Sequence, residues 1–267
     1  MTRVPGDRLA QRFAALPHTT GLIPYFTAGY PSLDVTLELL RACEPHVLAV
    51  ELGIPFSDPI ADGPDIQRAS EWALARGIGA AETLGLVARY RSGGGALPII
   101  LMTYANPILR PGIERFAADA AEAGVDALLV SDLPPDEAPD VWQALDRAGL
   151  ATVMLVAPTT PAERLPLLVA RARGFVYCLA RTGVTGAGGG FAGAIEERVS
   201  HVRALTSLPV AVGFGIATGE QAAALRGVAD AVVVGAALMR EVARDPGANA
   251  AERVTARVRE FAGALAN

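Results

Sequence analysis

The sequence predicts an α/β protein with the fold of a single-domain (β/α)8 TIM barrel carrying an extra N-terminal helix and an inserted helix. Its 267 residues match the usual length of such a barrel. Hydrophobic residues make up 51% of the chain and aromatic residues only 6%, which suits parallel strands buried on both faces by Ala, Val, Leu and Ile. Eight short apolar runs are each followed by a helical pattern, with short connections. No change of composition marks a linker, so residues 1–267 are expected to form one domain.

The expected elements alternate regularly along the chain. Residues 7–16 predict an opening helix that caps one end of the fold, and Ser32 is the expected N-cap of the next helix. Strands are expected at 22–26, 47–50, 98–103, 127–130, 152–156, 175–179, 210–212 and 231–234. Helices are expected at 33–42, 64–76, 80–91, 112–123, 136–148, 161–172, 194–206 and 218–226, followed by closing helices. The pair at 64–76 and 80–91 contains the inserted helix. A doubly wound open sheet is the alternative, and in either fold the carboxyl ends of the strands line the site.

Composition argues against several classes of function. The net charge is −5 and no block of basic residues occurs, which argues against a nucleic-acid or anionic-membrane surface. The first residues have no apolar signal core and no apolar run approaches ~18 residues, so a cytoplasmic protein without a membrane span is expected. Cys43 and Cys178 lie far apart in apolar surroundings and are expected to be buried free thiols.

The chain contains no lysine, because all 23 basic residues are arginines. This removes a lysine Schiff base and a lysine anchor for pyridoxal phosphate from the possible mechanisms. His18, His46 and His201 show no metal-ligand spacing, so no metal site is expected. Acid and base chemistry therefore falls mainly to carboxylates, with tyrosine as a minor candidate.

Residues 47–70 concentrate acidic side chains behind a short apolar segment. Residues 47–50 are expected to form a buried strand that holds Glu51 at its carboxyl end, while Asp58 and Asp62 lie on a loop that can move. Pro64 suits the first position of the following helix. An aspartate before Pro or Gly is ordinary turn chemistry, and taken alone each would be structural. Glu51 favours function, since a carboxylate at the end of an apolar strand is unfavourable unless it is paired or used.

Two glycine clusters follow the seventh and eighth expected strands, Gly213-Phe214-Gly215 and Gly235-Ala236. One cluster alone would merely end a strand. Because these strands are neighbours in a barrel and a helix begins at Ala236, the two together favour a phosphate site. The loop 181–193 contains six glycines and is either a plain connection or a lid that closes over substrate. On closure Thr185 would offer its hydroxyl to a loop aspartate.

Several stretches resemble those of the α subunit of tryptophan synthase. They are IPYFTAGYP, ELGIPFSDPIADGP, LMTYANP, SDLPPDE, TGVTGA, VGFGI and the glycine at 235, in order over nearly the whole chain. The resemblance implies a barrel enzyme that cleaves indole-3-glycerol phosphate to indole and D-glyceraldehyde 3-phosphate. It also implies a pyridoxal-phosphate-bearing β subunit as partner in an α2β2 heterotetramer, with no cofactor in this chain.

The resemblance also implies roles for individual residues. The catalytic carboxylates would be Glu51, serving indole C3 and the side-chain hydroxyl with a pKa raised by its apolar strand, and Asp62, ionised at the ring nitrogen. The segment 55–58 would face the β subunit. Phosphate contacts are implied at Gly186, Gly213, Phe214, Gly215, Gly235 and Ala236, lid residues at Arg181 and Thr185, and an indole pocket at Tyr25, Met102, Tyr104, Ser131, Leu155 and Tyr177.

This sequence departs from the family pattern at a few positions. Ala236 stands where serine is usual, and a glycine run follows Thr185 in place of more polar residues. Tyr25 and Ser131 add polarity to the indole pocket. Three alternatives stay open at this point: a stand-alone indole-releasing lyase, a regulatory phosphate-binding subunit, and a different phosphate-binding barrel such as a sugar-phosphate isomerase.

Overall fold

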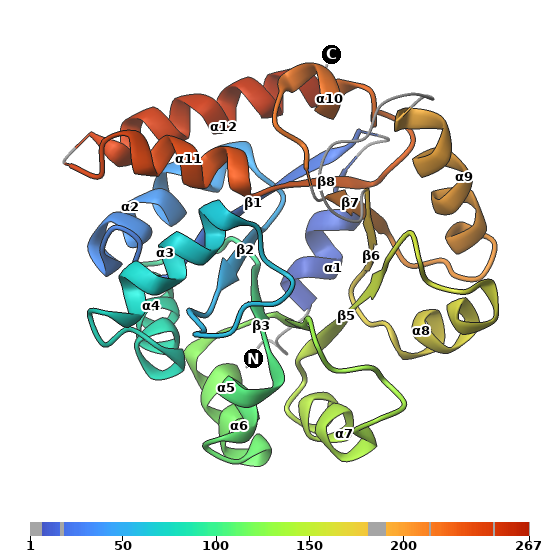
Figure 1. Ribbon diagram of the computed structural model, residues 1–267, viewed down its shortest axis with the longest axis horizontal. Coiled ribbons are helices and arrows are strands. Elements are labelled where there is room, and N and C mark those ends of the chain that lie inside the picture. The colour runs from blue at the N-terminus through green and yellow to red at the C-terminus, as the bar shows by residue number, and fades with distance from the viewer. Residues whose placement is uncertain (1–6, 17–18, 181–190, 214, 248, 267) are drawn as a thin grey trace.

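Eight parallel strands form a closed barrel in the computed structural model, which describes residues 7–16, 19–180, 191–213, 215–247 and 249–266 (Figure 1). Each strand pairs with the next, and β1 pairs with β8 from Gly21↔Ala231 to Pro24↔Val234. The predicted barrel is therefore confirmed and the open sheet is excluded. The strands are β1 (Gly21–Thr27), β2 (Val50–Gly53), β3 (Ile99–Thr103), β4 (Ala127–Val130), β5 (Ala151–Val156), β6 (Val176–Leu179), β7 (Val210–Gly213) and β8 (Ala231–Val234).

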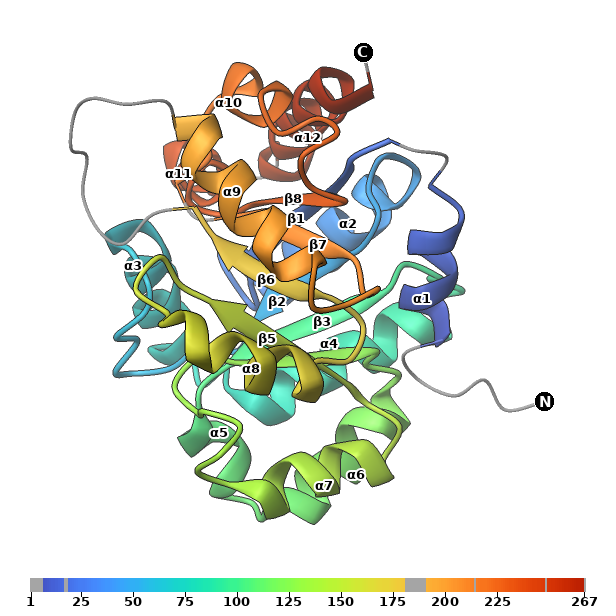
Figure 2. The same ribbon diagram turned by 90° about the vertical axis from the view of Figure 1, so that its right-hand side faces the viewer.

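Helices surround the barrel on its outside (Figures 1 and 2). The expected extra helix is present, since two helices, α3 and α4, connect β2 to β3. Pro64 opens α3, and Ser32 caps α2 by accepting a hydrogen bond from the backbone N–H of Val35. The helices are α1 (Asp7–Ala14), α2 (Leu33–Cys43), α3 (Pro64–Leu74), α4 (Ala80–Ser92), α5 (Ala105–Leu109), α6 (Ile113–Ala123), α7 (Pro139–Arg147), α8 (Leu165–Arg171), α9 (Phe191–Arg203), α10 (Gly219–Ala223), α11 (Ala236–Arg244) and α12 (Ala250–Ala266), with 3-10 turns η1 (Glu44–His46) and η2 (Ala162–Arg164).

The helix α1 covers the amino-terminal end of the barrel, as predicted (Figure 2). Its Arg8 pairs at 2.8 Å with the fully buried carboxylate of Asp126, which also pairs with Arg91 at 2.7 Å. The same carboxylate accepts a hydrogen bond from the backbone N–H of Ile99, the first residue of β3. Phe13 of α1 lies 5.7 Å from the ring of Phe175. The loops that follow the strands lie at the opposite end of the barrel, which α1 does not cover (Figure 2).

The core consists of the strands and the inner faces of the helices. Every residue of β2, β3, β4, β7 and β8 is buried, which agrees with strands covered on both faces. Cys43 and Cys178 are both buried and free, as expected. None of the described helices is long and apolar enough to cross a membrane.

The structure differs from the prediction in several elements, among them the second strand, a short helix that was not predicted, and the start of α9. The second strand is shifted from the predicted residues 47–50: β2 runs from Val50 to Gly53, so Glu51 lies inside the strand and not after its end. The reason is that pairing with β3 begins only where the backbone N–H of Val50 bonds to Pro98 O. The short helix α5 was not predicted, because its sequence ANPIL contains a proline and resembles a turn. Finally, α9 begins at Phe191, before the predicted residue 194.

Candidate active site

Glu51 is the most unusual buried residue of the barrel. It lies in β2 with only 2% of its surface exposed, and it is in register with Tyr25 on β1 and Ile100 on β3. Its Oε1 atom is buried and has no hydrogen-bond partner. A buried polar atom without a partner is destabilising, so it indicates a function that needs the free oxygen.

Asp62 lies at the end of the loop that joins β2 to α3. The loop turns twice before it, through the hydrogen bonds Ile60 N to Asp58 O and Asp62 N to Pro59 O. The Tyr104 hydroxyl donates to Asp62 Oδ2 at 3.0 Å. Asp62 Oδ1 is buried and has no partner. One oxygen of this carboxylate is therefore fixed by the protein and the other is free.

The two carboxyl groups interact with each other and titrate in different ranges. Burial, together with the charge of Asp62, raises the pKa of Glu51 to about 8. Burial raises the pKa of Asp62 to about 6, and the hydrogen bond from Tyr104 opposes this rise. Near pH 7 Glu51 is therefore mostly protonated and Asp62 mostly ionised. The site holds one acid and one base although both side chains are carboxyl groups.

Tyrosine rings form walls beside these carboxyl groups. Tyr25 is buried, and its hydroxyl lies 3.3 Å from Thr27 Oγ1. A Cβ atom added at Gly53 would overlap the Tyr25 hydroxyl, and one added at Gly213 would overlap that of Tyr177. Glycine is thus required at these two strand positions because an aromatic side chain lies over each. The charge of Glu51 also contributes to raising the pKa of Tyr177, after burial, so this ring belongs to the same site.

The remaining residues of the predicted indole pocket lie nearby. Met102 is buried and in register with Gly53, and Leu155 is in register with Tyr177. Ser131 follows β4, and its Oγ atom is buried without a partner. Ser131 and Leu155 also line a cavity of about 280 Å3 that extends toward α8. Among the described residues only four buried side-chain polar atoms lack a partner, and the oxygens of Glu51, Asp62 and Ser131 are three of them.

The predicted phosphate residues are placed only in part. Gly235 is the N-cap of α11, no side chain caps this helix, and Ala236 is its first residue, as predicted. A Cβ atom added at Gly235 would lie 3.3 Å from Tyr25 Cβ, so the start of α11 adjoins the wall formed by Tyr25. Gly215 has a φ of +83°. The predicted residues Phe214, Gly186, Arg181 and Thr185 lie outside the described part of the chain.

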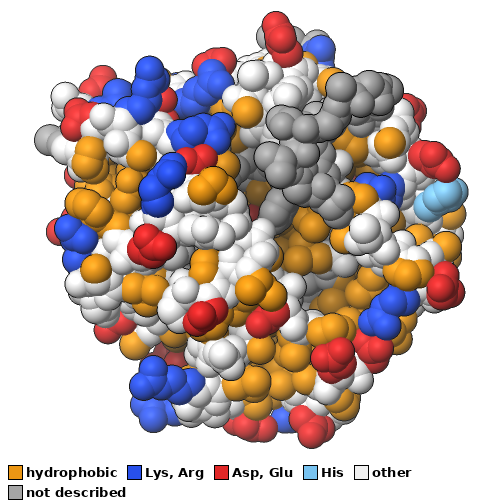
Figure 3. Space-filling model, in the orientation of Figure 1, with side chains coloured by type: hydrophobic (Ala, Val, Ile, Leu, Met, Phe, Trp, Pro, Cys, Tyr) orange, Lys and Arg blue, Asp and Glu red, His pale blue; other side chains and the backbone are white. Residues whose placement is uncertain are grey.

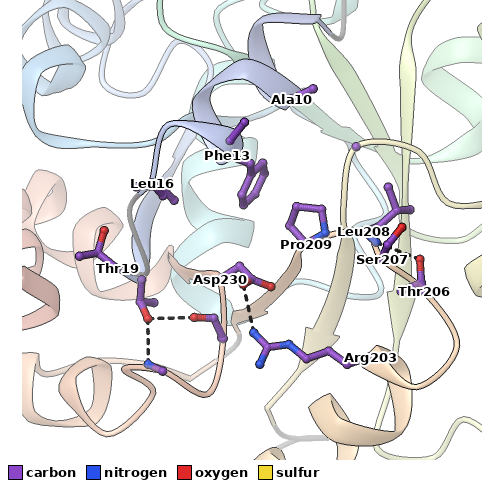
Figure 4. A pocket seen from close by; sticks show the side chains of 15 residues that line it. Ala10, Phe13, Leu16, Thr19, Arg203, Thr206, Ser207, Leu208, Pro209 and Asp230 are labelled. Atoms are coloured by element: carbon purple, nitrogen blue, oxygen red, sulfur yellow. Dashed lines mark hydrogen bonds and ion pairs between the residues drawn. The ribbon is translucent and has the colours of Figure 1, made fainter.

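These residues gather at the carboxyl ends of the strands, on the face that Figure 3 shows as hollowed at its centre. A different cleft, of about 950 Å3, lies at the opposite face between α1 and the residues around Pro209 (Figure 4). Its charged groups Arg203 and Asp230 are paired at 3.0 Å, so it offers no free acid or base. No cluster of His, Cys, Asp or Glu suited to a metal ion occurs among the described residues.

Two supporting residues were missed in the sequence. The Gln67 side chain on α3 donates to the backbone oxygen of Asp62 at 2.8 Å, and Thr27 contacts the Tyr25 hydroxyl. The contact of Thr27 could have been predicted from its position, because residues i and i+2 of a strand, here Tyr25 and Thr27, share a face. The hydrogen bond of Gln67 could not have been predicted from the sequence, since its partner is a backbone atom of an irregular loop.

The chain is similar to known proteins in its family pattern, its sequence and its structure. A family model described as tryptophan synthase alpha chain matches residues 13–267. A tryptophan synthase alpha chain of Caulobacter sp. (strain K31) is 46% identical over 265 residues, which is 97% of this chain and 96% of that protein. A Mycobacterium tuberculosis tryptophan synthase structure is 37% identical, with a TM-score of 0.87 over 97% of this chain and 98% of the other. The tryptophan synthase a2b2 complex of Pyrococcus furiosus is 38% identical, with a TM-score of 0.83 over 92% and 98%.

Proposed function

The chain belongs to the tryptophan synthase alpha chain family, and from this premise we propose that Glu51 and Asp62 are its two catalytic carboxyl groups. The protein is the alpha-subunit lyase of tryptophan biosynthesis, which cleaves indole-3-glycerol phosphate to indole and D-glyceraldehyde 3-phosphate. The observation that carries the residue assignment is the pair of buried carboxyl groups, each with one oxygen that has no partner.

The reaction is a retro-aldol cleavage in which the substrate itself accepts the electrons. Glu51, protonated near neutrality, donates its proton to indole C3, and the ring becomes an iminium-like cation. The resulting Glu51 carboxylate then removes the proton of the neighbouring side-chain hydroxyl. As that oxygen forms the aldehyde C=O, the carbon–carbon bond to C3 breaks and its electron pair returns to the ring. One proton has moved from oxygen to carbon, so Glu51 ends the cycle protonated.

Asp62 stabilises the charged intermediate. Its free Oδ1 accepts a hydrogen bond from the ring N–H, and its negative charge opposes the positive charge that develops on the ring. The pKa of about 6 keeps it ionised at neutral pH, when this charge is needed. The rigid strand position of Glu51 suits a group that must reach two neighbouring substrate atoms in turn.

The phosphate end of the substrate is proposed to bind at Gly213, Gly215, Gly235 and Ala236. Gly186 and Phe214, which lie outside the described residues, are proposed as further phosphate contacts. The first N–H groups of α11 have no side-chain cap and point their positive end toward this position. The indole ring is proposed to lie among Tyr25, Met102, Tyr104, Ser131, Leu155 and Tyr177. Arg181 and Thr185 are proposed as lid residues, with Thr185 meeting Asp62 on closure.

The partner of this chain is a tryptophan synthase beta subunit, in line with the complexes among its structural relatives. We propose an α2β2 heterotetramer in which pyridoxal phosphate is bound by the partner and no cofactor is bound by this chain, which has no lysine to anchor it. Residues 55–58 are proposed to face the partner. They line a groove of about 1070 Å3 beside α5, where Leu109 is 42% exposed. The cytoplasmic location and the single domain over residues 1–267 stay predictions.

The relatives support neither a stand-alone indole-releasing lyase nor a regulatory subunit, because they carry the alpha-chain description. The experiment incubates the purified chain with indole-3-glycerol phosphate and follows indole, alone and with the beta subunit. Glu51→Gln and Asp62→Asn are expected to fold and to lose at least 100-fold in kcat, as roughly expected for loss of a general acid or base. Turnover that survives in Glu51→Gln would refute the assignment of Glu51.

A further inference from the structure

Tyr104 makes two hydrogen bonds with the same short segment of the loop between β2 and α3. Its hydroxyl donates to Asp62 Oδ2 at 3.0 Å and accepts from the backbone N–H of Ala61 at 3.1 Å. It therefore binds both the side chain of Asp62 and the backbone beside it. A residue that merely lined an indole pocket would not need either bond.

The backbone of Tyr104 is itself fixed. Tyr104 follows β3 and is the N-cap of α5, and only 2% of its surface is exposed. The next residue, Ala105, donates its backbone N–H to Asp132 Oδ1 at 2.7 Å. A tyrosine side chain has two rotatable torsions before its hydroxyl, so a fixed backbone and a packed ring determine the position of the oxygen.

The ring of Tyr104 packs against Phe56, which lies at the beginning of the same loop. The ring centroids are 5.0 Å apart and the planes are inclined by 30°. The loop thus rests on Tyr104 at two places, with Phe56 on the ring and with Ala61 and Asp62 on the hydroxyl. An aromatic pair of this kind contributes stabilisation in addition to that from burying the two rings, so it helps to hold the Tyr104 ring in one rotamer.

We propose that Tyr104 is the positioning residue for Asp62: its hydroxyl fixes Oδ2, so that Oδ1 is left to meet the substrate N–H, and Phe56 holds the ring in place. This inference rests on the proposed function of Asp62. The bond also favours the ionised carboxylate, because a hydroxyl donates to a charged oxygen more strongly than to a protonated carboxyl group. Since Phe56 belongs to residues 55–58, a partner that moves this ring acts on Asp62 through a single side chain.

The charge of Asp62 acts on titratable groups from three strands. They are Glu51 on β2, Tyr25 on β1 and Tyr104 at the end of β3. Burial raises the pKa of both tyrosines above the ordinary value, so they stay neutral during the titration of Asp62. The pKa of Glu51 is about 8, so it is still protonated when Asp62 titrates near 6. Among these protein groups Asp62 is therefore the one that titrates on the acidic limb of the pH profile. The substrate phosphate also titrates at about pH 6, but its contribution is the same for every variant and cancels when variants are compared.

The test compares Tyr104→Phe with Tyr25→Phe, which removes a hydroxyl from the same site without touching Asp62. In Tyr104→Phe the acidic limb of kcat/KM against pH is expected to move upward by about one pH unit, as the loss of one hydrogen bond to a charged group implies. Activity at pH 6 then falls about fivefold more than activity at pH 8, because less Asp62 is ionised. In Tyr25→Phe the limb keeps its position.

A uniform loss at every pH in Tyr104→Phe, with the limb unmoved, would overturn the proposal and leave Tyr104 as a pocket residue only. Should that variant not fold, Phe56→Leu keeps the hydroxyl and removes the ring contact. It is expected to move the limb in the same direction by a smaller amount, and an unmoved limb there counts against the proposal.

A second measurement separates this proposal from the proposed function. The side-chain carboxyl carbon of Asp62 is titrated by 13C NMR in the wild type and in Tyr104→Phe, with the signal identified by its absence in Asp62→Asn. A higher Asp62 pKa in Tyr104→Phe supports the inference even if the wild type produces no indole. An unchanged titration overturns it even if the wild type is an active lyase.

Discussion

Replacing Glu51 by glutamine is expected to make the protein more stable while it removes the activity. The pKa of this buried carboxyl group rises from its usual 4.5 to about 8 in the fold. Below pH 4.5 the group is protonated in the folded and the unfolded chain, so the rise has no effect. Between 4.5 and 8 the unfolded chain releases the proton while the folded chain keeps it, which favours unfolding. Above 8 the destabilisation is complete and constant.

Each pH unit in this interval corresponds to ~1.4 kcal/mol, which gives a ceiling of about 5 kcal/mol above pH 8. Water entry and side-chain relaxation reduce such values, so we expect Glu51→Gln to gain about 2–4 kcal/mol over the wild type at pH 8. The amide also lacks a partner for its oxygen, but that effect does not change with pH. The gain should therefore shrink steadily as the pH falls to 4.5, until only this pH-independent difference remains.

The assay is urea unfolding of the wild type and Glu51→Gln at intervals from pH 4 to pH 9. Glu38→Gln, which removes an exposed carboxylate from α2, serves as the reference for the loss of one surface charge. A difference between Glu51→Gln and the wild type that is the same at pH 4.5 and pH 8 would refute the reasoning. It would mean that Glu51 is ionised in the fold.

Three further predictions concern the site and its support. The profile of kcat/KM should rise through about pH 6 as Asp62 ionises and fall through about pH 8 as Glu51 loses its proton, and a flat profile from pH 5 to pH 9 would contradict this. Asp126→Ala removes the carboxylate that pairs with Arg8 and Arg91 at the amino-terminal end of the barrel, and it should lower the free energy of unfolding in urea by about 3–5 kcal/mol. Asp34→Ala, which breaks an exposed ion pair, should change this free energy far less. Gly53→Ala should lower the free energy of unfolding by about 1–3 kcal/mol, because the added Cβ overlaps the Tyr25 hydroxyl. Adding Tyr25→Phe to this variant should restore part of the lost stability, because it removes that hydroxyl.

The barrel could be predicted because its strands are buried on both faces and therefore stand out as short apolar runs. The runs at 127–130 and 231–234 match β4 and β8 to the residue. The second strand could not be delimited in this way. Residues 47–49 are as apolar as β2 and nearly as buried, and only pairing with β3 separates them. Hydrophobic pattern identifies a buried segment, whereas hydrogen bonding decides where a strand begins.

The burial of one candidate site residue could be predicted for a related reason. Glu51 is conspicuous because a carboxylate within an apolar run is rare, and its burial and raised pKa follow from that position. The bond between Tyr104 and Asp62 has no such signal, since it joins residues 42 positions apart through an irregular loop. Its geometry depends on the two turns between Asp58 and Asp62, which no periodicity encodes.

The difference in pKa between the two carboxyl groups follows from the deeper burial of Glu51, the hydrogen bond that Asp62 accepts from Tyr104, and the charge of Asp62 near Glu51. Both groups are buried and both have a raised pKa, yet Asp62 titrates about two pH units below Glu51. Asp62 accepts a hydrogen bond from Tyr104, whereas Oε1 of Glu51 accepts none, and the charge of Asp62 raises the pKa of Glu51 further. An ionised Asp62 thus helps to keep Glu51 protonated. The proposed acid at C3 and the proposed carboxylate at the ring nitrogen are therefore coupled. A change that neutralises Asp62 is expected to lower the pKa of Glu51 and to leave less of it protonated near pH 7.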